Sequence, residues 1–190
     1  NGAIGLWLRL PSNYLITRAL ELPMQHERLL TLSEGVTEVI AITEEPGTGR
    51  TLFTNGHRMS STAPLSQRYM RAFAHIPLLS ADKPETVLVI GFGVGNTTQA
   101  ATLHPSVRRV EVVDLSRHVL THAGYFKNSN GDVLNDRRVA VYVNDGRQHL
   151  QMQRPGSYDL ITLEPPPIAQ AGVAALYSEE FYALAKTRLK

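Results

Sequence analysis

The hydrophobic pattern divides the chain into two parts with different periodicity. From Glu27 to Asn55, short apolar and β-branched runs are separated by Pro-Gly and Asn-Gly turns, which is typical of antiparallel hairpins. The strands expected there are 28–32, 37–43 and 50–54. From Pro64 onward, stretches with helical spacing alternate with short, continuous apolar runs, and this alternation predicts helices and buried strands in turn.

The second part predicts a parallel, doubly wound sheet. The expected strands are 86–90, 107–113, 139–143 and 158–163, and the expected helices are 64–76, 94–103, 116–126, 145–152 and 179–189. Because parallel strands need crossover connections, the intervening helices are expected to cover both faces of the sheet. The fold class is therefore α/β, with a small antiparallel β-lobe in front of the parallel sheet.

Local chemistry predicts where several helices begin and end. Thr62 is expected to cap the helix that starts at Pro64, and Pro77 is expected to end it. One face of this helix carries residues at three- and four-residue spacing, namely Leu65, Tyr69, Ala72, Phe73 and Ile76. Ser116 and Ser178 are the expected caps of two later helices.

The amino-acid composition restricts the possible functions more than it restricts the possible folds. The chain has 190 residues, of which 43% are hydrophobic and 19% charged, and its formal net charge is +2. That charge is too small to indicate binding to nucleic acid or to an anionic membrane surface. The absence of cysteine excludes disulfides, thiolate metal sites and cysteine nucleophiles. The histidines show no spacing typical of a metal site, so no metal is expected.

The two ends of the chain are abrupt. Residues 2–8 are mainly apolar and follow Asn1 instead of a methionine, and Lys190 closes a helical segment with no strand after it. We interpret the chain as an excerpt of a longer protein. The expected parts are a lead-in over 1–26, a β-lobe over 27–63 and an incomplete nucleotide-binding domain over 64–190. For the lead-in, a strand, a surface helix and the end of a membrane helix are alternatives.

The end of the first parallel strand carries the clearest chemical signal. Gly91, Gly93 and Gly95 follow the apolar run 87–90, and Asp114 ends the next strand, 19 residues after Gly95. Glycine lets a backbone approach a ligand closely, because it has no Cβ and adopts positive φ easily. The pattern predicts a nucleoside-binding βαβ unit in which Asp114 accepts both ribose hydroxyls. The alternative is a tight turn without a ligand and an aspartate that caps a helix.

The other strand ends carry further candidates, because ligands bind at the carboxyl ends of strands in such sheets. Asn144 and Asp145 follow the third parallel strand. Asp145 either accepts from an adenine amino group or only caps the following helix. Glu164 follows the fourth strand and is the candidate reactive carboxylate, with pairing to a nearby cation as the alternative. Tyr69 either lines this pocket or packs in the core.

Several segments resemble the spermidine synthase (polyamine aminopropyltransferase) family. They run in the family's order, at 52–56, 69–78, 87–95, 104–107, 112–115, 144–146, 158–161 and 176–182. The resemblance implies a methyltransferase-like nucleotide domain behind the β-lobe. It also implies decarboxylated S-adenosylmethionine as aminopropyl donor and a small-molecule amine or polyamine as acceptor. By position, it implies ribose binding by Asp114, adenine recognition by Asp145, a channel-lining role for Tyr69 and a base role for Glu164.

Five positions differ from the family pattern. Val94 stands where the family has the aspartate that holds the donor amino group, and Arg71 stands where it has a glutamate. Pro167 replaces the second acid of the family's Asp-x-x-Asp. Asn55 begins the segment that is Asp-Gly-x-x-Gln in the family, and Glu164 replaces the family's aspartate base.

The residues 164–167 and the turn 91–96 are most similar to spermidine synthase-like domains fused to multi-spanning, transporter-like regions of bacterial membrane proteins. This implies a soluble domain at the cytoplasmic face of the inner membrane, tethered through a region outside the chain, with a homodimer as a further expectation. Three functions stay open. They are an aminopropyltransferase, a methyltransferase that uses S-adenosylmethionine itself, and a non-catalytic polyamine- or nucleoside-sensing domain.

Overall fold

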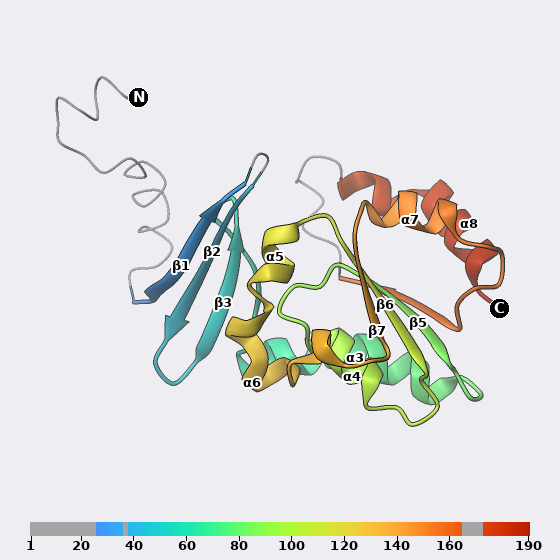
Figure 1. Cartoon of the computed structure of the whole chain (residues 1–190), viewed down its shortest axis with the longest axis horizontal. Helices are drawn as coiled ribbons and strands as arrows, with labels where there is room; N and C mark the ends of the chain where they lie inside the picture. The colour runs from blue at the N-terminus through green and yellow to red at the C-terminus, as the bar shows by residue number, and fades with distance from the viewer. Residues whose placement is uncertain (1–25, 36–37, 165–172) are drawn as a thin grey trace, which may run out of the picture.

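The computed structural model describes residues 26–35, 38–164 and 173–190, which form two four-stranded sheets side by side (Figure 1). The sheet nearer the N-terminus is antiparallel and the other is parallel. Residues 1–25 of the expected lead-in, and Pro165 to Pro167, lie outside the described residues.

The β-lobe is the antiparallel sheet, in the order β1-β2-β3-β4. Its strands are β1 (Arg28–Glu34), β2 (Val39–Glu45), β3 (Gly49–Thr54) and β4 (His57–Ser61). The Asn55-Gly56 turn between β3 and β4 has φ of 52° and 79°, the positive values that such two-residue hairpin turns require. We did not expect β4, because its sequence has no β-branched or aromatic residue and it is held by pairing with β3.

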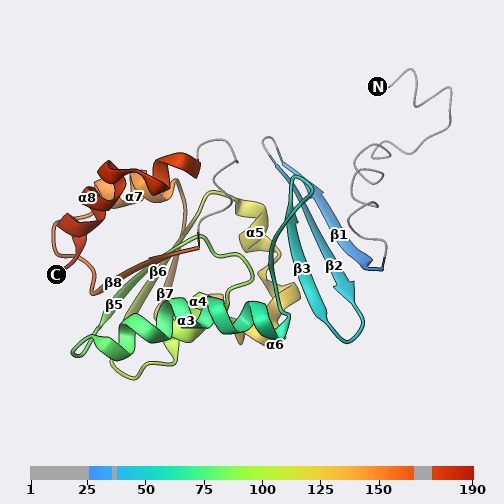
Figure 2. The same ribbon diagram turned by 180° about the vertical axis from the view of Figure 1, so that it is seen from behind.

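The expected doubly wound sheet is present in the order β7-β6-β5-β8. Its strands are β5 (Thr86–Ile90), β6 (Arg109–Asp114), β7 (Val139–Val143) and β8 (Leu160–Leu163). One face is covered by α3 (Pro64–Ser80) and α4 (Asn96–Thr102), and the other by α7 (Gly146–Met152) and α8 (Glu179–Arg188), as Figures 1 and 2 show. In the part of the chain that is described, no helix has the length and apolar character needed to cross a membrane.

Short helices join the main elements. They are α5 (Arg117–Thr121), η1 (Ala123–Phe126), α6 (Lys127–Asn130), η2 (Val133–Asn135) and η3 (Val173–Tyr177). The helix expected over 116–126 is therefore broken, because the α-helix ends at Thr121 and a 3-10 turn that contains Gly124, a weak helix former, follows. Ser116 and Ser178 cap α5 and α8 as expected, each accepting a hydrogen bond from a backbone N–H.

The helix α3 differs from its predicted boundaries at both ends. Its N-cap is Ala63, because Thr62 Oγ1 accepts a hydrogen bond from the Arg50 N–H at 2.8 Å and so serves the lobe instead. Pro77 lies inside the helix and does not end it. A proline leaves the carbonyl four residues earlier without its helical donor.

The carbonyl that Pro77 leaves free belongs to Phe73. Thr162 of β8 donates a hydrogen bond to it from Oγ1 at 3.3 Å. The sheet thus supplies the missing donor, which explains why the helix tolerates the proline.

The apolar face predicted for α3 is not its buried face. The buried residues are Met70, Ala74 and Leu78, whereas Leu65, Tyr69, Phe73 and Ile76 are 75%, 42%, 43% and 66% exposed. Apolar residues occupy both faces of this helix, so their spacing could not select the side that packs on the sheet. The exposure of Tyr69 argues against its interpretation as a core residue.

A buried polar cluster holds α7 and the start of β8 to β6. Glu111 of β6 is 5% exposed and accepts a hydrogen bond from the Tyr158 hydroxyl at 2.6 Å. Its carboxylate also lies 3.1 Å from His149 Nε2 and 2.7 Å from Arg109 Nη2. Burial would raise the pKa of Glu111, but the hydrogen bonds from His149 and Tyr158 and the charge of Arg109 hold it below its usual range.

We expect Tyr158→Phe to lower the free energy of unfolding by about 1.5–3 kcal/mol, because a buried carboxylate loses a hydrogen bond. The matched control is Tyr182→Phe on α8, where the side chain is 53% exposed, and its effect should stay within about 0.5 kcal/mol. Urea denaturation of both variants measures the difference. Equal losses from the two substitutions would contradict the role assigned to the cluster.

Candidate active site

The carboxyl ends of the parallel strands point toward the β-lobe (Figure 1). Gly91, Asn144 and Glu164 directly follow β5, β7 and β8, and Asp114 is the last residue of β6. The lobe reaches the same edge, because a Cβ placed on Gly93 would lie 2.9 Å from Ser60 Oγ of β4. The candidate site therefore lies between the two sheets.

The turn after β5 requires its glycines. Gly91, Gly93 and Gly95 have φ of 86°, 53° and 86°, which other residues adopt only with strain. A Cβ at Gly95 would also lie 2.6 Å from the ring of Phe92 and 3.0 Å from Asn130. The turn is thus a tight backbone cradle with no room for side chains at Gly95.

Asp114 is joined to this turn by its backbone. Its Oδ2 accepts a hydrogen bond from the Phe92 N–H at 2.7 Å, and its Oδ1 accepts one from the Ser116 N–H at 2.8 Å. Burial raises the pKa of Asp114, the two N–H donors oppose the rise, and the nearby Glu38 carboxylate adds to it. Each oxygen of a carboxylate can accept a second hydrogen bond, so Asp114 can still accept from two ribose hydroxyls.

Asp145 caps α7, which confirms the capping alternative given for this residue. Its Oδ1 accepts a hydrogen bond from the Gln148 N–H at 2.9 Å. Asn144 Oδ1 accepts one from the Asp145 N–H at 2.9 Å, and Asn144 Nδ2 lies 3.9 Å from the sulfur of Met152. Among the described residues, Asp145 Oδ2 has no hydrogen bond, so the cap leaves an oxygen that could accept from an adenine amino group.

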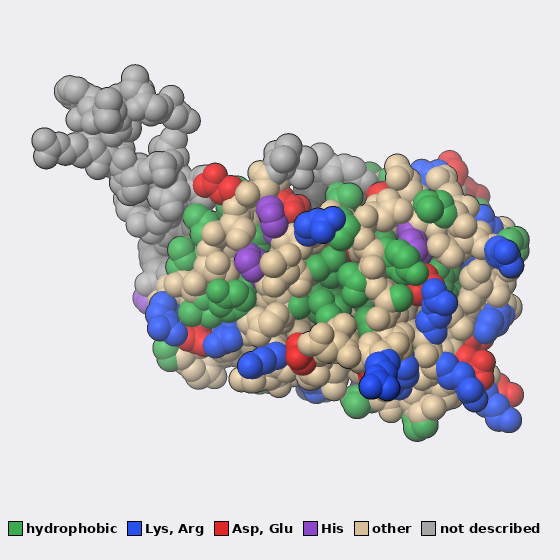
Figure 3. All heavy atoms as spheres, in the orientation of Figure 1, with side chains coloured by type: hydrophobic (Ala, Val, Ile, Leu, Met, Phe, Trp, Pro, Cys, Tyr) green, Lys and Arg blue, Asp and Glu red, His purple; other side chains and the backbone are tan. Residues whose placement is uncertain are grey.

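Leu115 is a residue at this edge that the sequence reasoning did not single out. It follows Asp114 directly and is 73% exposed, and Val143, which pairs with Asp114 across the sheet, is 45% exposed. Figure 3 shows apolar side chains gathered on the face where β6 and β7 lie. Exposed apolar side chains beside Asp114 offer a surface on which a nucleobase can pack. The sequence signal that could have identified Leu115 is an apolar residue directly after the acid that ends a strand.

Glu164 and Tyr69 form a hydrogen-bonded pair at the end of β8. The Tyr69 hydroxyl donates to Glu164 Oε1 at 2.6 Å, across 95 positions of sequence. Burial raises the pKa of Glu164, and the hydrogen bond from Tyr69 opposes that rise. Burial and the Glu164 carboxylate together raise the pKa of Tyr69, so the phenol keeps its proton. Among the described residues, no lysine or arginine pairs with Glu164, so the alternative of a structural ion pair is not supported.

Two of the positions that depart from the family pattern have structural uses. Val94 is wholly buried in the core that also holds Met70 and Phe92. Arg71 donates a hydrogen bond from Nη2 to the Ser129 carbonyl at 3.0 Å, so it links α3 to α6. Neither side chain is paired with Glu164 among the described residues.

Asn96, directly after the glycine turn, has an unsatisfied side chain. It is 0% exposed, and neither Oδ1 nor Nδ2 has a hydrogen-bond partner in the described part of the chain. An unpaired buried amide costs about 1–3 kcal/mol. The glycine cradle and the Asp114 carboxylate fit an adenosyl-sulfonium ligand. The described residues contain no group of three or more histidines and acids that could hold a metal ion.

The fold is a methyltransferase-like (Rossmann-type) α/β fold with a small antiparallel sheet beside it. The profile of the family described as "Spermine/spermidine synthase domain" matches residues 66–190. The chain belongs to this family.

The chain is also similar to curated polyamine aminopropyltransferases. The chain is 30% identical to the polyamine aminopropyltransferase of Bacillus subtilis over 168 residues, which are 88% of the chain and 59% of that protein. It is 35% identical to that of Moorella thermoacetica over 115 residues, which are 60% of the chain and 40% of that protein. The chain thus spans about half the length of the curated relatives that it matches.

Solved structures show the same fold. A spermidine synthase in complex with the transition-state analogue AdoDATO superposes with a TM-score of 0.79 at 24% identity, covering 86% of the chain and 55% of that structure. The spermidine synthase of Thermotoga maritima superposes with a TM-score of 0.75, also at 24% identity, covering 86% and 54%. These likenesses confirm the expected fold class.

We expect Gly95→Ala to destabilise the protein more than Gly156→Ala does. Both positions have positive φ, 86° and 67°, so both variants pay about 1–2 kcal/mol for the backbone conformation. Only at Gly95 does the new Cβ meet other atoms, which adds about 1–3 kcal/mol of overpacking. Thermal or urea unfolding measures both. If the two variants were equally stable, the turn would not be packed as described.

Proposed function

We propose that the protein transfers an aminopropyl group from decarboxylated S-adenosylmethionine to a small-molecule amine or polyamine. The observation that carries the proposal is the hydrogen-bonded pair of Glu164 and Tyr69, on the same sheet edge as Asp114. Family membership supports it, since the matched profile includes every strand end of this edge. The cofactor-binding residues proposed are Gly91, Gly93, Gly95, Asp114, Asn144 and Asp145.

The chemistry assigned to Glu164 is proton removal from the acceptor amine. In the reaction, the acceptor nitrogen forms a bond to the aminopropyl carbon, the carbon–sulfur bond breaks, and the sulfonium becomes the neutral thioether of methylthioadenosine. Glu164 takes the proton that the nitrogen loses. Its burial suits this role, because a raised pKa makes the carboxylate a stronger base. Tyr69 keeps its proton and orients the carboxylate.

A second candidate is a methyltransferase that uses S-adenosylmethionine. The observation that favours it is Val94, because a buried apolar side chain places no negative charge where the family has an acid. The carboxylate that distinguishes this donor would meet no repulsion there. Competition between the two donors for the intact protein decides: tighter binding of the decarboxylated donor supports aminopropyl transfer, and tighter binding of the carboxylated one overturns it.

We further propose that the domain acts at the cytoplasmic face of a bacterial inner membrane, tethered by a region outside the chain, and that it forms a homodimer. Support comes from the similarity of 164–167 and 91–96 to membrane-fused domains of the family. Recovery of the full gene product in the membrane fraction tests the tether, and its recovery only in the soluble fraction would exclude it.

Glu164→Gln should reduce turnover by about 10²–10⁴-fold, because the glutamine cannot accept the amine proton. Binding of methylthioadenosine should stay within about threefold of wild type, since Asp114 and the glycine turn are untouched. Steady-state kinetics measures the turnover, and calorimetry measures the affinity for methylthioadenosine. Wild-type protein that binds nucleoside without any turnover would instead favour the sensing function. Absence of adenosyl binding would exclude both transferases and a nucleoside sensor.

Tyr69→Phe should move the acid limb of the kcat/KM profile to higher pH. Glu164 must be deprotonated to act, so activity rises as pH passes its pKa. The Tyr69 hydrogen bond lowers that pKa, and its loss therefore raises it further above the usual value. A pH profile of the variant, measured with saturating donor, checks the direction. A limb that stays in place or moves to lower pH would rule out the pairing in solution.

A further inference from the structure

The strand β7 lies at one edge of the parallel sheet, and in the described part of the chain it pairs only with β6. The Arg138 carbonyl accepts a hydrogen bond from β6 at 2.9 Å, and the Asn144 N–H donates one to β6 at 3.1 Å. The N–H and C=O of one residue point to the same side of a strand, and those of the next residue point to the opposite side. The backbone groups of Val141 and Val143 are therefore directed away from β6, to the open edge.

This edge has none of the usual protections against pairing with another strand. Natural edge strands commonly carry a charged side chain, a proline or a bulge. The residues Val139–Val143 are all uncharged, none is proline, and their register with β6 is regular. Val141 and Val143 are 40% and 45% exposed, on the face where Figure 3 shows apolar side chains together. The edge is thus suited to pairing with a further strand.

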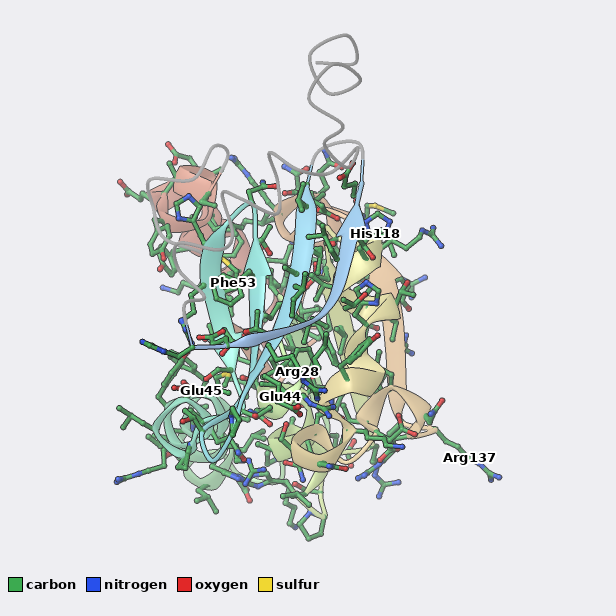
Figure 4. The ribbon with its side chains drawn as sticks, turned by 90° about the vertical axis from the view of Figure 1, so that its left-hand side faces the viewer. Arg28, Glu44, Glu45, Phe53, His118 and Arg137 are labelled. Carbon is green, nitrogen blue, oxygen red and sulfur yellow. The ribbon has the colours of Figure 1, made fainter. Side chains whose placement is uncertain are left out.

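The free charges at the two ends of β7 are opposite in sign. Arg137, two residues before the strand, is exposed and has no ion pair among the described residues, and Figure 4 shows its side chain extending away from the molecule. The neighbouring Arg138 is already paired with Asp136 at 2.6 Å. Asp145, two residues after the strand, uses only Oδ1 to cap α7. A cation thus precedes the strand and an anion follows it.

An antiparallel second copy of β7 fits this edge in one register. With Val141 opposite Val141 of the copy, the two residues can exchange both of their free hydrogen bonds. The Val143 N–H then faces the Val139 carbonyl of the copy. Tyr142 lies opposite Ala140 of the copy, so a large side chain meets a small one. Both backbone and side chains are matched in this register.

We propose that β7 is the interface of the homodimer, paired antiparallel with β7 of a second copy about a two-fold axis at Val141. The inference rests on the homodimer proposed above and gives it an interface. Arg137 of each copy then lies at the same end as Asp145 of the other, whereas parallel pairing would bring two Arg137 side chains together. A two-fold contact is self-complementary and closed, so it forms a dimer and not a filament.

The pairing is compatible with the ligand role proposed for Asp145. Each oxygen of a carboxylate can accept two hydrogen bonds, so the cap, an arginine of the copy and an adenine amino group can share this side chain.

Single cysteines test the register, because the chain has no cysteine of its own. In Val141→Cys, the two substituted residues are directly opposite, with Cα atoms about 5.5 Å apart, which suits a disulfide. In Val143→Cys, the matched control, they are about 13 Å apart along the strands, at about 3.3 Å per residue, which is too far. Mild oxidation of the intact protein and non-reducing electrophoresis should show mainly cross-linked dimer for Val141→Cys and mainly monomer for Val143→Cys and wild type.

Val141→Lys tests the interface without a cross-link. It places two ammonium groups opposite each other, so the dissociation constant of the dimer should rise by about 100-fold or more. Leu103→Lys adds the same charge at a residue that is 59% exposed at the end of α4, and it should change that constant by less than about threefold. Sedimentation equilibrium of the intact protein measures both.

The outcomes separate the interface from the homodimer. A wild-type dimer in which Val141→Cys forms no more cross-link than Val143→Cys, or in which Val141→Lys leaves the dissociation constant unchanged, would overturn the interface while the homodimer stands. A wild-type protein that stays monomeric at every concentration would overturn both. Neither result bears on aminopropyl transfer, which turnover measures independently.

Discussion

The hydrogen bond from the Phe92 N–H to Asp114 Oδ2 is the contact on which the candidate site depends. It ties the turn after β5 to the last residue of β6, so the cradle and the carboxylate keep a fixed separation. The turn can deliver this N–H only because Gly91, Gly93 and Gly95 adopt positive φ. The parallel register, in which Ile90 lies opposite Val113, brings the two strand ends to one level. The same backbone therefore sets both the shape of the turn and the position of the Asp114 carboxylate.

The charges of the site are unevenly distributed. At the nucleoside end, Asp114 and Glu38 place two carboxylates around Ser116. At the other end, Glu164 is the carboxylate that accepts from Tyr69, and the position that is acidic in the family is the buried Val94. Under the proposed function, such a site would hold a ribose by hydrogen bonds and would offer a cationic tail fewer anionic partners. Selection among amines would then depend on the base and on shape more than on multiple ion pairs.

The strand ends could be predicted from the sequence because their signals are local. Parallel strands appear as continuous apolar runs, and a glycine, an acid or an asparagine at the end of each run marks the ligand edge. What could not be predicted depends on distant partners. Thr162 lets α3 continue through Pro77, and both faces of that helix are apolar, so its buried side is set by the sheet. Glu38 lies far from Asp114 in sequence, so only the docking of the lobe shows that both carboxylates accept from Ser116.

The serine bridge between the two sheets also has a consequence for folding. Ser116 is joined to Asp114 within one turn of chain but to Glu38 across 78 positions, so the contact can form only after the hairpins and the parallel sheet have each collapsed and met. Non-local contacts of this kind are formed late and slowly. A ligand that bound between the two sheets would bind only their assembled state and would stabilise it by mass action. Such a ligand would couple the unfolding of one sheet to that of the other.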